Sequence, residues 1–194
     1  MTFRADRIGK TLIAAGLLTL IYVASVWVRA GVYQAYQQRA FEESLQAASS
    51  GLAPTDGRSP SGSVMGRLEI PSVNLSVMVL EGVGESELRL GAGHVPGTAF
   101  PGETGNVGIA GHRDTFFRPL RKIREHDVIT LTTLQGTSRY RVEAIWITRP
   151  DDTAVLQSSS ESVLTLVTCH PFSYIGSAPD RFIVRARRVS DLHS

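Results

Sequence analysis

Residues 163–169 read VLTLVTC, and this apolar run that ends in a cysteine is the stretch that most directly indicates the fold. Valine, leucine and threonine dominate it, which is typical of a β-strand. Side chains two positions apart on a strand share a face, so Leu164, Leu166 and Thr168 should lie on one face and Cys169 on the other. If the leucines point into a core, the strand presents the thiol on its outer side.

A second strand-like run, RFIVRARRV at 181–189, follows after a short connection. If Phe182 points into the same core, Arg181 lies on the outer face together with Cys169. The intervening residues, HPFSYIGSAPD, would form the loop between two adjacent antiparallel strands. This arrangement predicts that the Cys169 thiol and the Arg181 guanidinium lie within reach of one substrate.

Further strand signals predict an all-β fold for the region after residue 64. Short apolar or β-branched runs recur with frequent turns, and Gly136 lies between two of them, as a hairpin needs. The runs are GRLEIPSVNLSVMVLEG (66–82), VGIAG (107–111), DVITLTTL (127–134) and RYRVEAIWIT (139–148). Many short strands favour a closed barrel or a sandwich. Residues 84–93 and 115–123 predict one or two short helices, and the Pro and Gly residues at 96–102 indicate a loop.

The start of the chain carries an uncharged apolar segment, TLIAAGLLTLIYVASVWV at 11–28. As a helix it would be about 27 Å long, close to the hydrocarbon thickness of a bilayer. Arg4, Arg7 and Lys10 precede it, and basic residues before a span place the N-terminus in the cytoplasm. We therefore interpret residues 1–30 as a cytoplasmic tip and a transmembrane anchor, with the rest of the chain outside the membrane.

The alternative interpretation of this segment is a cleaved signal peptide. Val28-Arg29-Ala30 loosely resembles a small-x-small cleavage site, but the apolar run exceeds the usual h-region of about 7–15 residues. Both interpretations export the remainder of the chain.

Between the apolar segment and the strands lie two polar stretches. Residues 31–48 have a helical pattern that is polar on one side, and residues 49–63, SSGLAPTDGRSPSGS, are rich in Ser, Gly and Pro. The second composition is typical of a flexible tether. The predicted organisation is therefore a juxtamembrane helix and tether at 31–63 and a globular β-domain at 64–194.

Composition limits the chemistry that the chain can perform. The 194 residues carry a net charge of +2 and no dense basic block, so nothing indicates nucleic-acid binding. Cys169 is the one cysteine, which excludes an internal disulfide and leaves a buried thiol or a reactive one. A metal site built from His94, His112, Cys169 and His170 is conceivable, but their spacing matches no known ligand pattern. We therefore expect no cofactor and no metal.

The stretch AGHRD at 110–114 places His112 directly after an apolar strand. A histidine at the exposed end of a strand can accept or donate a proton near neutral pH. His170 is a weaker candidate as partner of Cys169, because neighbouring residues of a strand point to opposite faces.

The motifs together resemble the sortase family, bacterial enzymes that attach proteins to the cell envelope. TLVTC, GHRDTFF and an arginine after a loop carry the resemblance, which covers about residues 64–189. IAGHRDTFFRPL with TLVTCHPFSYIGSAPDRFIV is most similar to the class D branch. The resemblance implies an eight-stranded barrel and a catalytic triad of His112, Cys169 and Arg181. His94, in GAGHVPG, matches a family motif but not the catalytic histidine.

The resemblance also implies the reaction and the location. Sortases cleave a signal such as LPxTG or LPxTA near a protein's C-terminus, forming a thioester on the cysteine, here Cys169. An amine of the cell envelope, or a pilin-type lysine, then takes the acyl group. The enzyme would be a single-pass membrane protein with its catalytic domain on the extracytoplasmic side. The segment PDDTAVLQSSSES at 150–162, which should border the substrate groove, is short.

Three other functions deserve comparison. Papain-like cell-wall peptidases place cysteine before histidine, whereas His112 here precedes Cys169. L,D-transpeptidases resemble an SxGC context, which differs from VTCH. A membrane-tethered β-barrel that captures envelope peptides without cleaving them would still bind them without Cys169, and its thiol would have no special reactivity.

Overall fold

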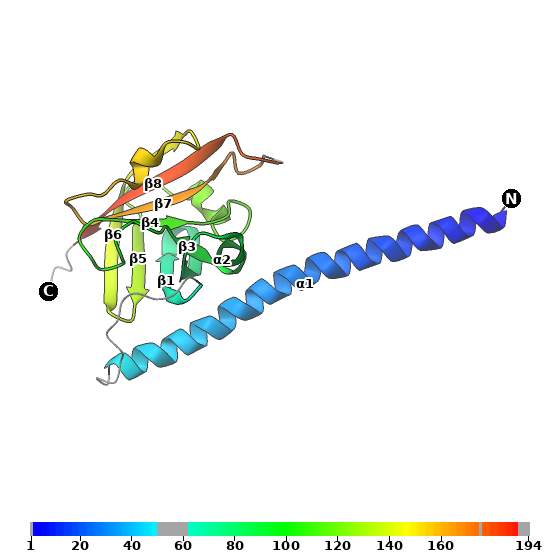
Figure 1. The fold of residues 1–194 in the computed structure, drawn as a ribbon, viewed down its shortest axis with the longest axis horizontal. Coiled ribbons are helices and arrows are strands. Elements are labelled where there is room, and N and C mark those ends of the chain that lie inside the picture. Colours follow the sequence, from blue (N-terminus) through cyan, green and yellow to red (C-terminus); the bar gives the residue numbers. More distant parts are fainter. Residues whose placement is uncertain (1, 50–61, 175, 190–194) are drawn as a thin grey trace.

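The computed structural model describes residues 2–49, 62–174 and 176–189, with the backbone alone for 2–11, 26–27, 29–30 and 44–49 (Figure 1). Eight strands close into a barrel in the order β1-β2-β3-β4-β7-β8-β6-β5. They are β1 (Val64–Ile70), β2 (Leu75–Glu81), β3 (Ala92–His94), β4 (Asn106–Ala110), β5 (Val128–Thr133), β6 (Gly136–Thr148), β7 (Val163–His170) and β8 (Asp180–Val189). The prediction of a closed eight-stranded barrel is confirmed, and the sandwich is excluded.

Strand pairing in the barrel is mixed. β2 with β3 and β4 with β7 are parallel pairs, and the remaining neighbours, including β7 with β8, are antiparallel. The carboxyl ends of β4 and β7 therefore lie side by side at one end of the barrel.

Alternating apolar side chains fill the barrel. In β5, Ile129 and Leu131 are buried, and their neighbours Val128, Thr130 and Thr132 are partly exposed. In β7, Leu164, Leu166 and Thr168 are buried, as the alternation predicted. The principal core residues are Leu68, Ile70, Leu75, Val77, Val79, Val107, Ile109, Phe117, Leu120, Ile129, Leu131, Tyr140, Val142, Leu164, Leu166, Val184 and Ala186.

The short helices differ in kind. The predicted helix at 84–93 is the α-helix α2 (Glu85–Leu90), and the one at 115–123 is a single 3₁₀ turn, η2 (Arg118–Lys122). Two further 3₁₀ turns, η1 (Pro71–Val73) and η3 (Thr153–Leu156), had no sequence signal. Gly136 does not form the hairpin turn itself: it begins β6 and pairs with Thr133.

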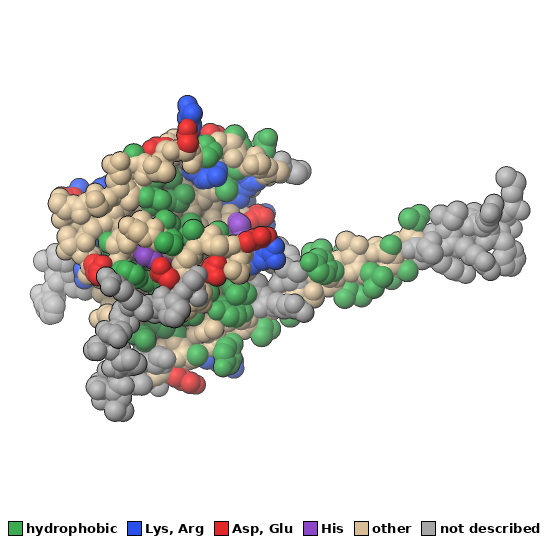
Figure 2. Space-filling model, in the orientation of Figure 1, with side chains coloured by type: hydrophobic (Ala, Val, Ile, Leu, Met, Phe, Trp, Pro, Cys, Tyr) green, Lys and Arg blue, Asp and Glu red, His purple; other side chains and the backbone are tan. Residues whose placement is uncertain are grey.

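One helix, α1 (Thr2–Ser49), precedes the barrel and continues well beyond it toward the N-terminus (Figure 1). Its large apolar side chains from Leu12 to Val28, where described, are mostly exposed, and Figure 2 shows them along the part that leaves the barrel. Among the residues described, no helix is found that is long and apolar enough to cross a bilayer. The predicted anchor at 11–28 includes Thr11, Val26 and Trp27, whose side chains are not described, and most of the predicted tether, 50–61, also lies outside the described residues.

The second half of α1 packs on the barrel, which the sequence did not predict. The Gln34 side chain accepts a hydrogen bond from the Met78 backbone N–H at 2.9 Å and donates one to the Leu90 carbonyl. Phe41 is buried, and the carboxylate of Glu42 pairs with Arg67 at 3.0 Å. β3 pairs with β2 only from Val79 onward, so it does not reach the backbone N–H of Met78. Gln34 provides the acceptor for this N–H at the edge of the strand.

Candidate active site

Cys169 and Arg181 lie directly opposite each other on adjacent strands. The antiparallel register of β7 and β8 pairs these two residues, and both are half-buried. Directly opposite residues of an antiparallel pair project from the same face, with Cβ atoms about 4.5–5.5 Å apart. The prediction that Cys169 and Arg181 share one face of two adjacent antiparallel strands is therefore confirmed.

His112 follows the end of β4, the strand next to β7. The Gly111 N–H donates to the Val167 carbonyl at 3.1 Å, and the buried Thr168 hydroxyl donates to the Gly111 carbonyl at 2.7 Å. Gly111 and Thr168 thus lie side by side, and the next residues of these two parallel segments are His112 and Cys169. All three predicted site residues therefore emerge at the same end of the barrel.

Gly111 is required by packing. A Cβ atom there would lie 2.8 Å from the ring of Phe117, a core residue that is fully buried. A larger residue would have to displace this ring and, with it, the turn that carries His112. The glycine in the GHRD motif therefore lets the chain turn tightly over Phe117 just before the histidine.

Arg181 differs in its partners from the other arginines on its face of β8. Its Nη1 donates to the Asp180 carbonyl at 2.9 Å and, at 3.5 Å, to that of Ala178. Arg185 and Arg187 instead each bind the Glu143 carboxylate at 3.0 Å. Among the contacts described, Arg181 therefore meets neutral carbonyls, and its charge stays available for an anionic group.

The Glu143 ion pairs have an electrostatic consequence of their own. Burial alone would raise the pKa of Glu143, but hydrogen bonds from Arg187 and Arg185 outweigh it and lower that pKa below its ordinary value. The carboxylate therefore stays ionised and keeps both arginines occupied.

The other two histidines of this region are engaged elsewhere. His170 stacks on Phe182, the core-side neighbour of Arg181, so it lies on the opposite face of β7 from Cys169. His94 is buried, with Nδ1 2.8 Å from a Glu81 oxygen and Nε2 3.0 Å from the Ala99 carbonyl. In the described part of the chain, no three His, Cys, Asp or Glu side chains are grouped as a metal site would require.

The segment before β7 covers the outer face of the barrel beside the site. The Asn106 amide donates to the carbonyls of Val155 and Gln157 at 3.0 and 3.1 Å, and its oxygen accepts from the Thr165 hydroxyl at 2.7 Å. A Cβ atom on Gly108 would lie 2.8 Å from the side chain of Leu156. This cover explains why Thr165 is buried although it shares a face with Cys169.

We expect Thr165→Val to destabilise the protein by about 1–3 kcal/mol, because it leaves the buried Asn106 oxygen without its hydroxyl donor. Chemical denaturation of both proteins measures this difference. Thr137→Val, at an exposed position of β6, is the matched control and should change little. Equal stability of Thr165→Val and the parent chain would show that the Asn106 contact contributes nothing to anchoring.

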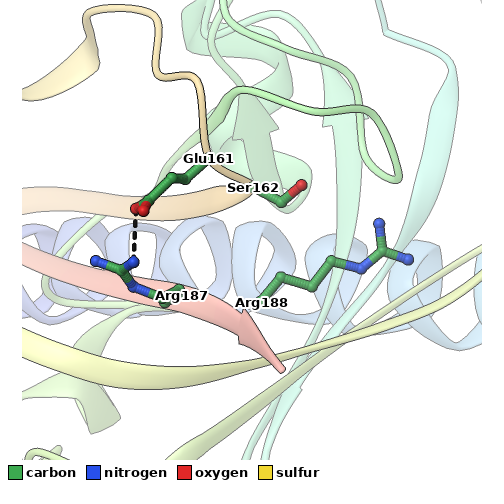
Figure 3. Close-up of a pocket in the computed structure, with 4 residues that line it drawn as sticks. All are labelled: Glu161, Ser162, Arg187 and Arg188. Carbon is green, nitrogen blue, oxygen red and sulfur yellow. Dashed lines mark ion pairs between the residues drawn. The ribbon is translucent and has the colours of Figure 1, made fainter. Parts of the chain in front are cut away.

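A shallow hollow lies at the far end of the same strand pair (Figure 3). Glu161 and Ser162 line it from the loop before β7, and Arg187 and Arg188 from β8, with Glu161 and Arg187 paired at 2.7 Å. Ser162 and Cys169 are seven positions apart along an extended chain, or about 23 Å. The hollow is thus separate from the site at Cys169.

Sequence reasoning missed two polar side chains near the site. Asn106 anchors the segment that covers the outer face, and Arg113, directly after His112, binds the carbonyls of Tyr174 and Gly176. Asn106 carried no local signal. Arg113 belongs to the GHRD stretch, and its positive charge was the only sequence signal that could have drawn attention to it.

The site suits acyl transfer, because it brings a thiol, an imidazole and a guanidinium to one end of the barrel. A cysteine thiolate is a strong nucleophile, a histidine can relay the proton, and a guanidinium can stabilise a developing oxyanion.

Comparisons with known proteins agree with this chemistry. A family model described as the sortase domain matches residues 68–189. Sortase D of Bacillus subtilis (strain 168) is 36% identical over 130 residues, which cover 66% of this chain and 66% of that protein. Sortase A of Listeria monocytogenes serovar 1/2a is 30% identical over 110 residues, or 55% of this chain and 49% of that protein. The chain therefore spans about half to two thirds of the length of these curated relatives.

A solved structure gives the same result. A Clostridium perfringens Sortase D5 transpeptidase superimposes with a TM-score of 0.67 at 30% sequence identity, covering 78% of this chain and 95% of that one. The similarity to Sortase D and Sortase D5 is consistent with the class D features of the sequence.

Proposed function

The chain belongs to the sortase family of cysteine transpeptidases, and from this premise we propose that it cleaves an LPxTG- or LPxTA-like signal after the threonine and transfers the acyl part to an amine. The observation that carries the proposal is the direct pairing of Cys169 with Arg181, next to the strand end that bears His112. His112, Cys169 and Arg181 are the proposed catalytic residues.

In the first half-reaction, the Cys169 sulfur attacks the threonine carbonyl carbon, and a C–S bond forms. The proton of the thiol passes to His112, either before substrate arrives or as the attack occurs. The carbonyl oxygen becomes an oxyanion, to which Arg181 donates through its planar fork. When the C–N bond breaks, His112 gives a proton to the leaving amine, and a thioester remains.

In the second half-reaction, an acceptor amine attacks the thioester carbonyl. The new C–N bond forms, the sulfur leaves, and His112 removes the proton that the amine sheds. We propose an amine of the cell envelope or a pilin-type lysine as acceptor. Water in place of the amine gives hydrolysis as a side reaction.

Arg181 cannot act as the base in this scheme, because a guanidinium does not lose its proton in proteins. Its two carbonyl partners, Ala178 in the loop and Asp180 at the start of β8, carry no charge, so a substrate carbonyl could replace them without separating an ion pair. This supports a role in binding the substrate carbonyl and the oxyanion.

We also propose that residues 11–28 anchor the protein in the cell membrane as a single span, with the N-terminus in the cytoplasm and the barrel on the extracytoplasmic side. The uncharged sequence, the basic residues before it and the exposed apolar side chains on α1 support this. Retention of the full chain in washed membranes, with release by detergent, tests it; release by salt alone would contradict it.

The proposed reaction is tested with quenched fluorescent peptides carrying LPxTG and LPxTA, an added amine acceptor and the full-length chain in detergent. We expect cleavage between the threonine and the next residue, and an acyl–amine product detectable by mass spectrometry. Cys169→Ala is the control and should give neither. A folded wild-type chain that binds these peptides but cleaves none would favour the binding module instead.

A further inference from the structure

The loop between β7 and β8 links two of the proposed catalytic residues. Cys169 lies just before it and Arg181 just after it, and residues 171–174 and 176–179 of the loop are described. A two-residue hairpin turn determines its own geometry, but a connection of this length does not. The β7–β8 register places the backbone of Arg181 opposite Cys169, but the Arg181 guanidinium binds the Ala178 carbonyl of this loop, so its direction depends on how the loop is held.

Arg113 supplies such contacts. Its Nη2 atom donates to the carbonyl of Tyr174 and to that of Gly176, both at 2.9 Å. The guanidinium carbon also lies 5.9 Å from the centre of the Tyr174 ring, within the range of a cation–π interaction. One side chain thus holds two carbonyls and one ring of the same loop.

The position of Arg113 in the chain gives these contacts their importance. Arg113 directly follows His112. Gly111, on the other side of His112, accepts a hydrogen bond from the Thr168 hydroxyl through its carbonyl. The turn that carries His112 is therefore bonded to β7 through Thr168 and to the β7–β8 loop through Arg113. Because Arg181 in turn binds the loop carbonyl of Ala178, the Arg113 contacts connect the histidine turn with the arginine.

A second observation argues against a purely stabilising role. The other terminal nitrogen, Nη1 of Arg113, is buried and has no hydrogen-bond acceptor among the described residues. A buried donor without an acceptor costs free energy, so this arm of the guanidinium does not stabilise the fold. The contacts of Arg113 are better explained by what its Nη2 atom does to the loop.

We propose that Arg113 is a positioning residue: by holding the Tyr174 and Gly176 carbonyls, it keeps the β7–β8 loop, and through it Arg181, aligned with the Cys169 thiol. Arg113 does not touch the reacting atoms. The inference rests on the proposed function and names a residue that acts through Arg181.

The test compares Arg113→Ala, Arg181→Ala and the double variant in the peptide assay with the full-length chain. We expect Arg113→Ala to lower kcat/KM by about 10- to 100-fold, mainly through kcat, because the oxyanion contact is misaligned. In the Arg181→Ala background the same substitution should cost less than about threefold, since the group it aligns is absent. Arg113→Lys keeps the charge and a donor but loses the planar guanidinium beside the Tyr174 ring, so it should fall between wild type and Arg113→Ala.

Two controls separate positioning from misfolding. Arg121→Ala, an exposed arginine of the following 3₁₀ turn, should leave kcat/KM unchanged. The rate of Cys169 alkylation by iodoacetamide should stay within about twofold in Arg113→Ala, while amide hydrogen exchange at residues 171–179 should accelerate.

The outcomes are distinguishable. Wild-type activity in Arg113→Ala, or losses from Arg113→Ala and Arg181→Ala that simply multiply, would overturn the positioning role while the proposed function stands. If the wild-type chain shows no cleavage that depends on Cys169, the proposed function fails, and the role of Arg113 in catalysis fails with it.

Discussion

Cys169→Ala should lower kcat/KM for a cleavable signal peptide by on the order of 10⁴-fold or more, because it removes the atom that forms the acyl intermediate. The side chain is half-buried at the end of β7, and the substitution removes one sulfur atom from the edge of the barrel rather than from its core. We therefore expect the thermal unfolding midpoint to change by no more than about 2 °C. Steady-state peptide cleavage and thermal unfolding of the same preparations provide both measurements.

A matched variant sharpens this result. Cys169→Ser keeps nearly the same shape but replaces a good nucleophile with a poor one, so it should be almost as inactive as the alanine variant. Mass spectrometry should detect a covalent adduct on the wild-type chain alone when a slowly resolved substrate is used. Substantial cleavage by the alanine variant would exclude the thioester mechanism, whatever the family of the protein.

Arg181→Lys is the second change with a large expected effect, a loss of about 10²- to 10³-fold in kcat/KM. Lysine keeps the positive charge, but it cannot present two parallel donors, and it holds the backbone carbonyls of Asp180 and Ala178 less rigidly. If the guanidinium binds the oxyanion, kcat and kcat/KM should fall by similar factors. Steady-state kinetics over a range of peptide concentrations separates the two parameters.

Arg187→Lys is the matched control for this prediction. Arg187 lies on the same strand and the same face as Arg181, yet it is paired with Glu143 and Glu161 at the other end of the strand pair. It should retain nearly full activity. If Arg181→Lys turned over substrate as fast as Arg187→Lys, Arg181 would be an ordinary strand-end charge with no part in the chemistry.

Much of the barrel could be predicted from local patterns. The alternation in residues 163–169 identified the buried face of β7, and the alternation in β8 identified the face that carries Arg181. Together they predicted that Cys169 and Arg181 share a face, and the structure pairs these two residues. By contrast, β3 spans only Ala92–His94, which is too short for a period to be recognised. The assignment of roles to His112, Cys169 and Arg181 came from the family resemblance, and their catalytic function stays a prediction.

The polar contacts between distant parts of the chain lay beyond any local pattern. Arg113 meets the loop carbonyls 61 and 63 positions away, Thr165 meets Asn106 at a separation of 59, and Gln34 reaches Met78 across 44. Periodicity reports which side of an element is apolar, but it carries no information about which distant polar group will face it.

The amino-acid sequence by itself determined the all-β class, the buried faces of the principal strands, the uncharged N-terminal segment and the three residues that form the candidate site. The strand faces follow from local spacing, because side-chain direction in a strand repeats every two residues. The three site residues follow from the resemblance to the sortase family. Only the tertiary structure decided the strand order of the barrel, the attachment of α1 to the edge of β2 through Gln34, and the contacts of Arg113 with the β7–β8 loop. Those contacts exist only once strands distant in sequence have paired, since each joins a side chain to a backbone group that the closed barrel brings within hydrogen-bonding distance.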